Sequence, residues 1–345
     1  MVDPVELAVA ALERIGFLLE RALEPTYRVK AFRGAAAAIR DLTPEELTRL
    51  VDEGELTSLA GVGPKTSAVI EAAVQGRTPA YLADVEKKFG APVASGGEEL
   101  RAALRGDLHT HSEWSDGGSP IAEMAATAAA LGHEYCALTD HSPRLTVARG
   151  LSPERLREQL EVLAGVNADL APFRLLSGIE CDILEDGGLD QTDELLGTVD
   201  VVVASVHSKL KMPAEDMTRR MVTAIANPHT DVLGHCTGRN VSPRGRRGAV
   251  RGESEFDAEI VFEACRRFGV AVEINSRPER LDPPRRLIRL ALDMGCRFAI
   301  DTDAHAPGQL DWQLYGTSRA EECGVPADRV VNTWPLEDLL AWTRG

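Results

Sequence analysis

The stretch DLHTHSEWSD, residues 107 to 116, combines residue types that bind metal ions. His109 and His111 are two positions apart, and Asp116 follows five positions beyond the second histidine. If the stretch is a β-strand that runs into a loop, alternate side chains share a face and both imidazoles can hold one ion. Two polar residues on a solvated strand face would give the same pattern. The remaining histidines must decide between these interpretations.

Short apolar runs farther along the chain end in the same residue types. We expect these runs to be strands, and functional side chains of a parallel barrel gather at the carboxyl ends of its strands. Six of the eight histidines fall at such ends. Beyond the first stretch, the positions are His141 in TDHS, Glu180 in GIECD, His207 in SVHS, His235 in GHCT, and Asp303 with His305 in DTDAH. One such histidine alone is typical of a hydrogen-bonded core, but the whole set predicts a centre for several metal ions.

The elements that must position these residues begin near residue 106. Seven short β-rich runs, from GDLHTH (106–111) to CRFAIDTDAH (296–305), alternate with helix-sized segments. This alternation implies parallel strands joined by crossovers. Seven repeats favour a closed (β/α) barrel, and an open doubly wound sheet is the alternative.

The first quarter of the chain has a different pattern. Apolar residues recur three or four apart in 5–23, 31–39 and 45–50, which predicts helices. The stretch APVASGGEELRAALRG carries Pro, Gly and Ser followed by charges, so we interpret it as a linker. We therefore expect a small all-α domain over 1–90, a linker over 91–105 and an α/β domain over 106–345.

Composition narrows the class of protein further. The net charge of −16 and the pI near 5.0 argue against a protein that coats nucleic acid by bulk electrostatics. None of the six cysteines forms a CxxC pair, so scattered reduced thiols and a cytoplasmic protein are expected. The N-terminal segment lacks the basic region of a signal peptide, and no apolar run approaches the ~18 residues of a membrane span. The sequence does not indicate an oligomeric state.

Several of these stretches together resemble the PHP (polymerase and histidinol phosphatase) superfamily. The matching stretches are GDLHTHSEWSDG, ALTDHS, GIECDILEDGGLD, VVASVHS, ANPHTDVLGHCTGR, EINSRPERLD and IDTDAH. They look most like the PHP domain at the C-terminus of bacterial family X DNA polymerases, over about residues 106 to 320. The resemblance implies a distorted (β/α)7 barrel that holds up to three metal ions.

The resemblance also implies a ligand set for each ion. The first ion would be held by His109, His111, Glu180 and Asp303. The second would share Glu180 and take His207 and His235. The third would take Asp116, His141 and His305. All these positions carry the expected residue types, so the resemblance implies a working hydrolase.

The N-terminal region resembles the small lyase-type domain that begins family X polymerases. RVKAFRGAAAAIRDL is followed by LAGVGPKTSAVI, which is similar to a helix-hairpin-helix motif. Backbone N–H groups of the hairpin, Gly61, Val62 and Gly63, would approach a DNA phosphate, and Lys65 would add an ionic contact. An ordinary tight turn between packed helices is the alternative. Val69 stands where the family has its Schiff-base lysine and the polymerase palm is missing, so neither lyase nor polymerase activity is expected.

The expected ligands define the expected chemistry. Mixed imidazole and carboxylate ligands suit Zn²⁺, Mn²⁺ or iron better than Mg²⁺ or Ca²⁺, so we expect two or three such ions. A carboxylate that bridges two ions, here Glu180, is typical of two-metal phosphoester hydrolysis, in which a metal-activated water attacks phosphorus. The residues expected to carry the reaction are His109, His111, Glu180, His207, Asp303 and Arg239.

Fixed cations should bind the phosphate of the substrate. Arg239 in GHCTGR follows the His235 strand end and could make a bidentate contact. Its loop continues NVSPRGRRGAVRGE, with five arginines between 239 and 251 and no acid before Glu253. This run predicts a local strip that tracks phosphates, and a solvated flexible loop is the alternative. Glu273, Asn275 and Arg277 match no ligand position, which leaves a role in holding ligands or substrate open.

Three functions compete on these observations. The leading one is a metal-dependent phosphoesterase at DNA ends, either a 3′–5′ exonuclease or a 3′-phosphatase, with DNA bound through residues 1–90. The second is a small-molecule phosphatase, for example on histidinol phosphate, which the acidic net charge favours and the hairpin domain disfavours. The third is a non-catalytic DNA-end-binding protein with structural metals, which the complete ligand set disfavours.

Overall fold

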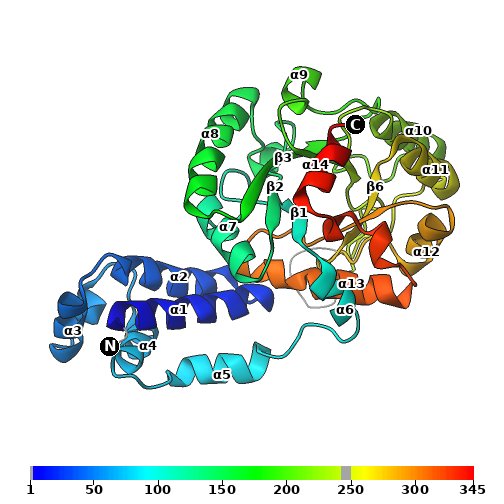
Figure 1. Ribbon diagram of the computed structural model, residues 1–345. Coiled ribbons are helices and arrows are strands. Elements are labelled where there is room, and N and C mark those ends of the chain that lie inside the picture. The colour runs from blue at the N-terminus through cyan, green and yellow to red at the C-terminus, as the bar shows by residue number, and fades with distance from the viewer. Residues whose placement is uncertain (1–2, 242–249) are drawn as a thin grey trace. The chain divides into compact units, whose positions relative to one another are not determined.

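The structure is a computed structural model that describes residues 3–241 and 250–345. The chain divides into two compact units, one ending at Pro92 and the other beginning at Val93 (Figure 1). Each unit has its own buried core, which agrees with the change of pattern along the sequence.

The first unit is a bundle of helices around one apolar core. Its elements are α1 (Pro4–Arg21), α2 (Thr26–Arg40), α3 (Pro44–Asp52), the 3₁₀ turn η1 (Leu56–Ser58), α4 (Pro64–Val74) and α5 (Ala80–Phe89). Helix α1 packs against all the other α-helices of the unit. Asp3 caps α1 by accepting the N–H of Val5, and Thr43 with Glu46 forms a capping box at α3.

The second unit contains a parallel barrel of seven strands in sequential order (Figure 1). The strands are β1 (Gly106–Thr110), β2 (Tyr135–Leu138), β3 (Arg174–Asp182), β4 (Val201–Ser205), β5 (Val232–Leu233), β6 (Ala271–Asn275) and β7 (Phe298–Asp301). Each strand pairs in parallel with the next. All seven predicted strands are confirmed, and the closed (β/α)7 barrel is the correct alternative rather than the open sheet.

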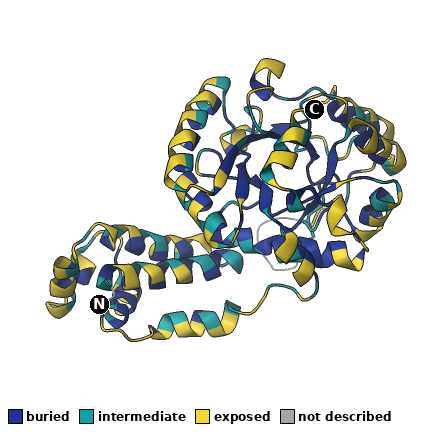
Figure 2. Cartoon of the chain, viewed as in Figure 1, coloured by how far each residue is buried: buried dark blue, intermediate teal, exposed yellow. Residues whose placement is uncertain are grey.

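Helices and short turns connect the strands and cover them from outside. The α-helices are α6 (Glu98–Ala103), α7 (Ile121–Ala130), α8 (Pro153–Asp169), α9 (Asp193–Leu196), α10 (Ala214–Ile225), α11 (Ala258–Phe268), α12 (Arg285–Asp293), α13 (Gln313–Glu322) and α14 (Leu336–Thr343). The 3₁₀ helices are η2 (Thr146–Ala148), η3 (Pro307–Trp312), η4 (Ala327–Arg329) and η5 (Val331–Thr333). The strands are buried on both faces, while the helices expose their outer faces (Figure 2).

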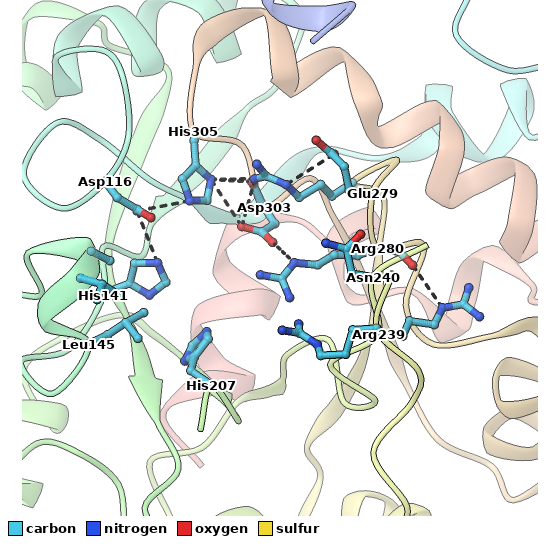
Figure 3. A pocket seen from close by; sticks show the side chains of 14 residues that line it. Asp116, His141, Leu145, His207, Arg239, Asn240, Glu279, Arg280, Asp303 and His305 are labelled. Carbon is cyan, nitrogen blue, oxygen red and sulfur yellow. Dashed lines mark hydrogen bonds and ion pairs between the residues drawn. The ribbon is translucent and has the colours of Figure 1, made fainter. Parts of the chain in front are cut away.

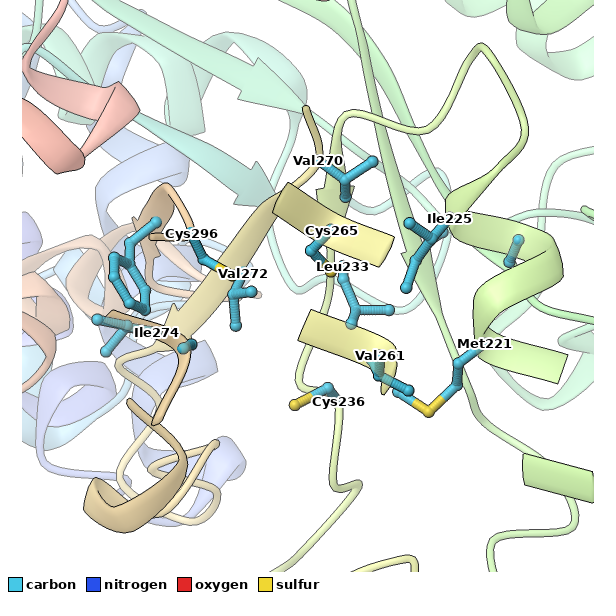
Figure 4. Packing of buried hydrophobic residues seen from close by; sticks show 14 of the residues in the cluster. Met221, Ile225, Leu233, Cys236, Val261, Cys265, Val270, Val272, Ile274 and Cys296 are labelled. Carbon is cyan, nitrogen blue, oxygen red and sulfur yellow. The ribbon is translucent and has the colours of Figure 1, made fainter. Parts of the chain in front are cut away.

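Two apolar layers flank the strands, as the alternation of side chains requires. One cluster draws residues from all seven strands, so it fills the barrel interior; it includes Leu176, Val203, Ala271 and Ala299. The C-terminal segment with Val331 and Leu339 and its flanking tryptophans packs against this interior cluster. The larger cluster joins the outer strand faces to the helices; Figure 4 shows part of it around β6, α10 and α11.

The barrel closes between β1 and β7 through one backbone bridge, Thr110 to Ala304, and through side chains. Asp301 on β7 accepts the backbone N–H of Leu108 at 2.8 Å, and Asp107 on β1 accepts both the N–H and the hydroxyl of Thr302. The amide of Asn332 donates to carbonyls on both strands, those of Gly106 and Ile300, and to Asp301. We call this group the seam; it supplements the single backbone bridge between the two strands.

The segment expected to be a linker is partly structured. Residues 98–103 form α6, which packs against α13. Gly97 donates its N–H to Glu321 at 2.7 Å, and Ser318 donates its hydroxyl to the carbonyl of Ser95. No signal in the sequence indicated this helix, because LRAAL is too short for a helical periodicity to be recognised.

Removing the seam amide should weaken the barrel. Asn332→Ala leaves the buried N–H of Ile300 without its acceptor and removes a donor from Asp301, while Gln313 still donates to the carbonyls of Gly106 and Ile300. The free energy of unfolding should therefore fall by about 1–3 kcal/mol. Urea unfolding followed by tryptophan fluorescence measures this, because Trp114, Trp312, Trp334 and Trp342 all lie in the second unit. Asn227→Ala, which removes one local bond to His229, is the control; equal losses in the two variants would contradict the role of the seam.

Candidate metal centre

The carboxylate of Glu180, on β3, lies at the centre of a cup at the carboxyl end of the barrel. It is 1% exposed and faces five imidazoles. Nε2 of His235 is 2.9 Å from Oε1, and Nδ1 of His141 is 2.8 Å from Oε2. The other nitrogen–oxygen distances are 3.2 Å for His207 Nε2, 3.4 Å for His109 Nε2 and 3.6 Å for His111 Nε2. Residues far apart in the sequence therefore meet around one buried acid.

Three overlapping groups of side chains have ligand atoms within 4.8 Å of one another. The first group is His109, His111 and Asp303; the second is His141, Glu180 and His207; the third is His111, Asp116, His141 and His305. His235 joins the cup through its contact with Glu180. The structure thus brings all nine expected ligands together, although His141 sits beside Glu180 and His207 as well as beside Asp116.

The donor atoms of the cup fit a divalent metal. Nε2 of His109, both ring nitrogens of His111 and of His207, and Oε2 of Glu180 are buried and make no hydrogen bond within the described residues. Some of these atoms lie close to an oxygen, but the angle does not suit a hydrogen bond. Nε2 of His207, for example, is 3.2 Å from Oε1 of Glu180. Buried polar atoms are rarely left unbonded. Converging lone pairs on nitrogen and oxygen are what Zn²⁺, Mn²⁺ or iron requires.

A buried aspartate holds the loop that carries Asp116. Asp140 accepts hydrogen bonds from the N–H and hydroxyl of Ser112, from the hydroxyl of Ser115 and from the amide of Gln159, at 2.5–2.8 Å. Asp116 itself is more open, with 38% of its side chain exposed, and its Oδ1 lies 3.2 Å from Nε2 of His305. One ligand of the third group is therefore presented on a supported loop at the edge of the cup.

A cavity of about 420 Å³ opens over the cup (Figure 3). The candidate ligands Asp116, His141, His207, Asp303 and His305 line one side. Further lining residues are Arg239, Asn240, Arg251, Arg277, Glu279 and Arg280, with Leu145, Val147 and Ala148 at the rim. Val147 is 91% exposed. The cavity thus combines acids and imidazoles, a group of four arginines and an apolar rim.

Arg280, which no sequence motif indicated as a site residue, forms an ion pair with a candidate ligand. Its Nε lies 3.0 Å from Oδ2 of Asp303 (Figure 3). Burial opposes the charged form of Asp303, but the Arg280 guanidinium, together with the neighbouring histidines and Arg277, holds the pKa of this carboxyl well below its usual range. Arg280 belongs to the stretch RPERLD, which lies in the loop after β6. A search for functional residues at strand ends does not extend that far along the loop.

Arg239 lines the cavity, but two nitrogens of its guanidinium group donate hydrogen bonds to backbone carbonyls. Its Nε donates to the carbonyl of Arg280 at 3.1 Å, and its Nη2 donates to the carbonyl of Leu281. The bidentate edge expected to face a phosphate therefore holds the 280–281 loop in this conformation. Of the arginine-rich run, residues 242–249 lie outside the described part of the chain, and Arg251 lines the cavity.

The charges of the cup are strongly coupled to its geometry. Burial opposes charge on His141, but the carboxylates of Glu180 and Asp116 outweigh it and raise the pKa of this imidazole from 6.5 to about 10. Burial likewise opposes charge on Glu180, yet the surrounding imidazoles, that of His207 first, hold the pKa of its carboxyl well below the usual range. The cup therefore keeps Glu180 ionised and holds a proton on His141 until another cation replaces it.

In the first unit the expected DNA-contacting residues form a tight hairpin. Gly61 has φ +91°, and a Cβ there would lie 3.3 Å from the carbonyl oxygen of Gly34, so only glycine suits this approach. The N–H of Val62 donates to Leu59, and the N–H of Gly63 donates to the hydroxyl of Thr66. Two of the three expected backbone donors are thus already bonded.

Cationic side chains accompany this hairpin. Lys65 is exposed in the first turn of α4, and its Nζ lies 6.0 Å from the ring centroid of Tyr81. Arg28 donates to the hydroxyl of the same tyrosine at 2.7 Å. Val69 is buried in the core of the unit, where it packs rather than reacts.

Comparisons with known proteins agree with both units. Residues 3–79 match the helix-hairpin-helix domain model, and residues 107–276 match the PHP domain model. A probable phosphatase of Acetivibrio thermocellus is 31% identical over 242 residues, which cover 66% of this chain and 90% of that protein. The chain therefore belongs to the PHP-domain family and carries a helix-hairpin-helix domain before its barrel.

Two further similarities come from a longer protein and a solved structure. The DNA polymerase/3′-5′ exonuclease PolX of Bacillus subtilis is 39% identical over 241 residues, which cover 70% of this chain but 41% of that protein. Histidinol phosphate phosphatase (HISK) from Lactococcus lactis, solved with Zn, L-histidinol and phosphate, gives a TM-score of 0.46 at 18% identity. That likeness covers 65% of this chain and 95% of the other. The fold assignment rests on the strand order itself.

Within the described residues, none of the helices is both long and apolar enough to cross a bilayer.

Metal binding should release protons from the cup. A ligating imidazole must be neutral, and His141, with a pKa near 10, carries a proton at pH 8. Calorimetric titration with Mn²⁺ at pH 8, in two buffers of different ionisation enthalpy, should give different heats. The apparent affinity should rise with pH toward 10, because fewer protons then compete for the imidazole. Equal heats in both buffers would contradict this assignment, and His141→Ala should reduce the number of protons released.

Proposed function

We propose that the chain is a metal-dependent phosphoesterase that acts at DNA ends, as a 3′–5′ exonuclease or a 3′-phosphatase. The observation that carries the proposal is the cup itself, in which nine imidazole and carboxylate side chains converge beside a group of arginines. The PHP domain match supports phosphate ester hydrolysis as the reaction class.

We assign the cup two or three divalent ions, Zn²⁺, Mn²⁺ or iron, held by the nine side chains expected from the sequence. Ions bound there would lower the pKa of a bound water to about 7 and offset charge on the phosphoryl oxygens. Glu180, central and ionised, is the carboxylate best placed to bridge two ions. Asp116 and His305 stand at the open edge, where a third ion would meet the substrate.

The arginines of the cavity bind and orient the phosphate. Arg280 and Arg277 both reach Asp303, so their guanidinium groups adjoin the position of the reacting phosphoryl group. Arg239 supports this arrangement by holding the carbonyls of the 280–281 loop. The apolar rim at Leu145 and Val147 suits the sugar or base attached to that phosphate.

The first unit supplies the argument for DNA. The helix-hairpin-helix match and the similarity to a PolX protein support DNA as partner. Lys65 is free of side-chain acids in the described contacts and lies at the start of α4, where the helix dipole adds positive potential. Phosphate contacts of this kind position DNA without reading its sequence.

A small-molecule phosphatase is the second candidate, because two observations favour it. The probable phosphatases of Acetivibrio thermocellus and of Thermoanaerobacter sp. are matched over 90% and 89% of their lengths, so proteins of this class need only the barrel. The net charge of −16 also disfavours a large DNA-binding surface. The cytoplasmic location expected from the sequence stays a prediction.

The two candidates separate in a substrate panel. Mn²⁺-loaded protein should turn over a 3′-recessed duplex or a 3′-phosphate oligonucleotide with higher kcat/KM than histidinol phosphate or p-nitrophenyl phosphate. Lys65→Glu should raise KM for the DNA substrates by about tenfold and leave p-nitrophenyl phosphate turnover unchanged, since it removes a phosphate contact far from the cup in sequence. Lys87→Glu on α5 makes the same charge change as a control, and His109→Ala should abolish every reaction. DNA turnover unaffected by Lys65→Glu would point to the barrel alone.

Arg280 should contribute strongly to the reaction, although it lies in a loop and not at a strand end. Arg280→Ala removes the cation beside Asp303, so kcat/KM should fall by about 10²–10³ for every phosphate ester, with Arg280→Lys intermediate. Steady-state kinetics on the panel measures this, and Arg266→Ala on the exposed face of α11 serves as the control. A change of less than threefold in Arg280→Ala would remove this residue from the proposed site.

A further inference from the structure

Strand β6 supplies no expected ligand, yet its inward side chains contact ligands from three other strand ends. Glu273 and Asn275 are two positions apart and share one face. Val272 and Ile274, between and beside them, belong to the outer core that packs against the helices (Figure 4). Glu273 and Asn275 therefore point toward the candidate ligands of the cup.

Glu273 holds two histidines at once. Its Oε1 lies 2.6 Å from Nδ1 of His109, and its Oε2 accepts the backbone N–H of His235 at 2.5 Å. The Glu273 side chain is 0% exposed. A carboxylate oxygen accepts hydrogen bonds, so Nδ1 of His109 is the donor in this contact and Nε2 is the ring nitrogen left for a metal. That Nε2 is the atom that faces Glu180 at 3.4 Å.

The next inward residues hold Asp303 in an uncommon conformation. Asp303 has φ +54°, a left-handed backbone that non-glycine residues rarely adopt. Asn275 Nδ2 lies 3.3 Å from Oδ2 of Asp303, and Arg277 Nη1 donates to its carbonyl at 2.8 Å. Asn275 also donates to Glu273 at 3.2 Å, which links the two halves of this arrangement. Strained residues persist where their surroundings fix them from several sides.

We propose that Glu273 is a positioning residue that presets His109 and His235 for metal binding, while Asn275 and Arg277 do the same for Asp303. The proposal rests on the metal centre assigned above but not on the identity of the substrate. A carboxylate that accepts the N–H of a ligating histidine fixes its tautomer and ring orientation and raises its basicity. In this barrel one carboxylate serves ligands of β1 and of the β5 end together.

The substitution Glu273→Gln tests the proposal with little change of shape. The glutamine side chain presents an NH₂ group to one of the two donors, so either Nδ1–H of His109 or N–H of His235 loses its acceptor. Mn²⁺ affinity of the full chain, measured by calorimetry, should fall about 10–100-fold.

The matched control is Asp231→Asn. Asp231 is also buried and accepts one backbone N–H, that of Val202 at 2.7 Å, but it precedes β5 at the opposite end of the strand. Mn²⁺ affinity in this variant should stay within twofold of that of the parent protein. An equal loss of affinity in the two variants would reduce Glu273 to a general structural role and overturn the proposal.

A second measurement uses the unaltered protein, so it does not depend on the folding of a variant. Long-range ¹H–¹⁵N correlation spectra of the histidine rings, recorded before metal is added, should show His109 protonated at Nδ1. Finding Nδ1 of His109 without a proton would overturn the proposal. Protein that binds Mn²⁺ with the expected tautomer but cleaves no DNA would sink the DNA-end function and leave the role of Glu273 intact.

Discussion

A buried carboxylate surrounded by imidazoles is the constraint on which this structure depends. Glu180 is almost fully enclosed, and removing an ionised acid from water is costly unless positive charge compensates it. Five histidines face it, and together they cannot all be charged without repelling one another. Bound divalent ions would compensate the charge of the acid, and they would bind the imidazoles in their neutral form. The layout of the strand ends follows from that electrostatic requirement.

The barrel meets this requirement by carrying polar residues above an apolar layer on the same strand face. Leu176 and Glu180 lie on one face of β3, and Ala299 and Asp303 follow the same alternation on and beyond β7. The lower residues exclude water and fill the interior, so the upper ones are held by a rigid base. Hydrogen-bonded acids such as Asp140 and Glu273 then fix the ligands that strand geometry alone leaves free to rotate.

The strands, and the side chains that gather at their ends as candidate ligands, could be predicted from the sequence because both leave local signals. A β-rich run that ends in His207 or in Asp303 can be recognised without knowing what lies beside it in space. The roles of Arg239 and Arg280 could not be separated in this way, since Arg239 binds backbone carbonyls of the folded loop and Arg280 binds the carboxylate of Asp303. The helix at 98–103 and the bonds of Asn332 also escaped, because their partners lie more than 30 residues away or carry no periodic pattern.

The seam between β1 and β7 has a consequence for how such a barrel changes over generations. A ladder of backbone hydrogen bonds tolerates almost any side chain, whereas this junction is spelled out by Asp107, Asp301 and Asn332. Substitutions of these three residues therefore affect the junction directly, whereas substitutions along a backbone ladder do not. Losing these residues would weaken the junction even where every candidate metal-binding side chain was still present.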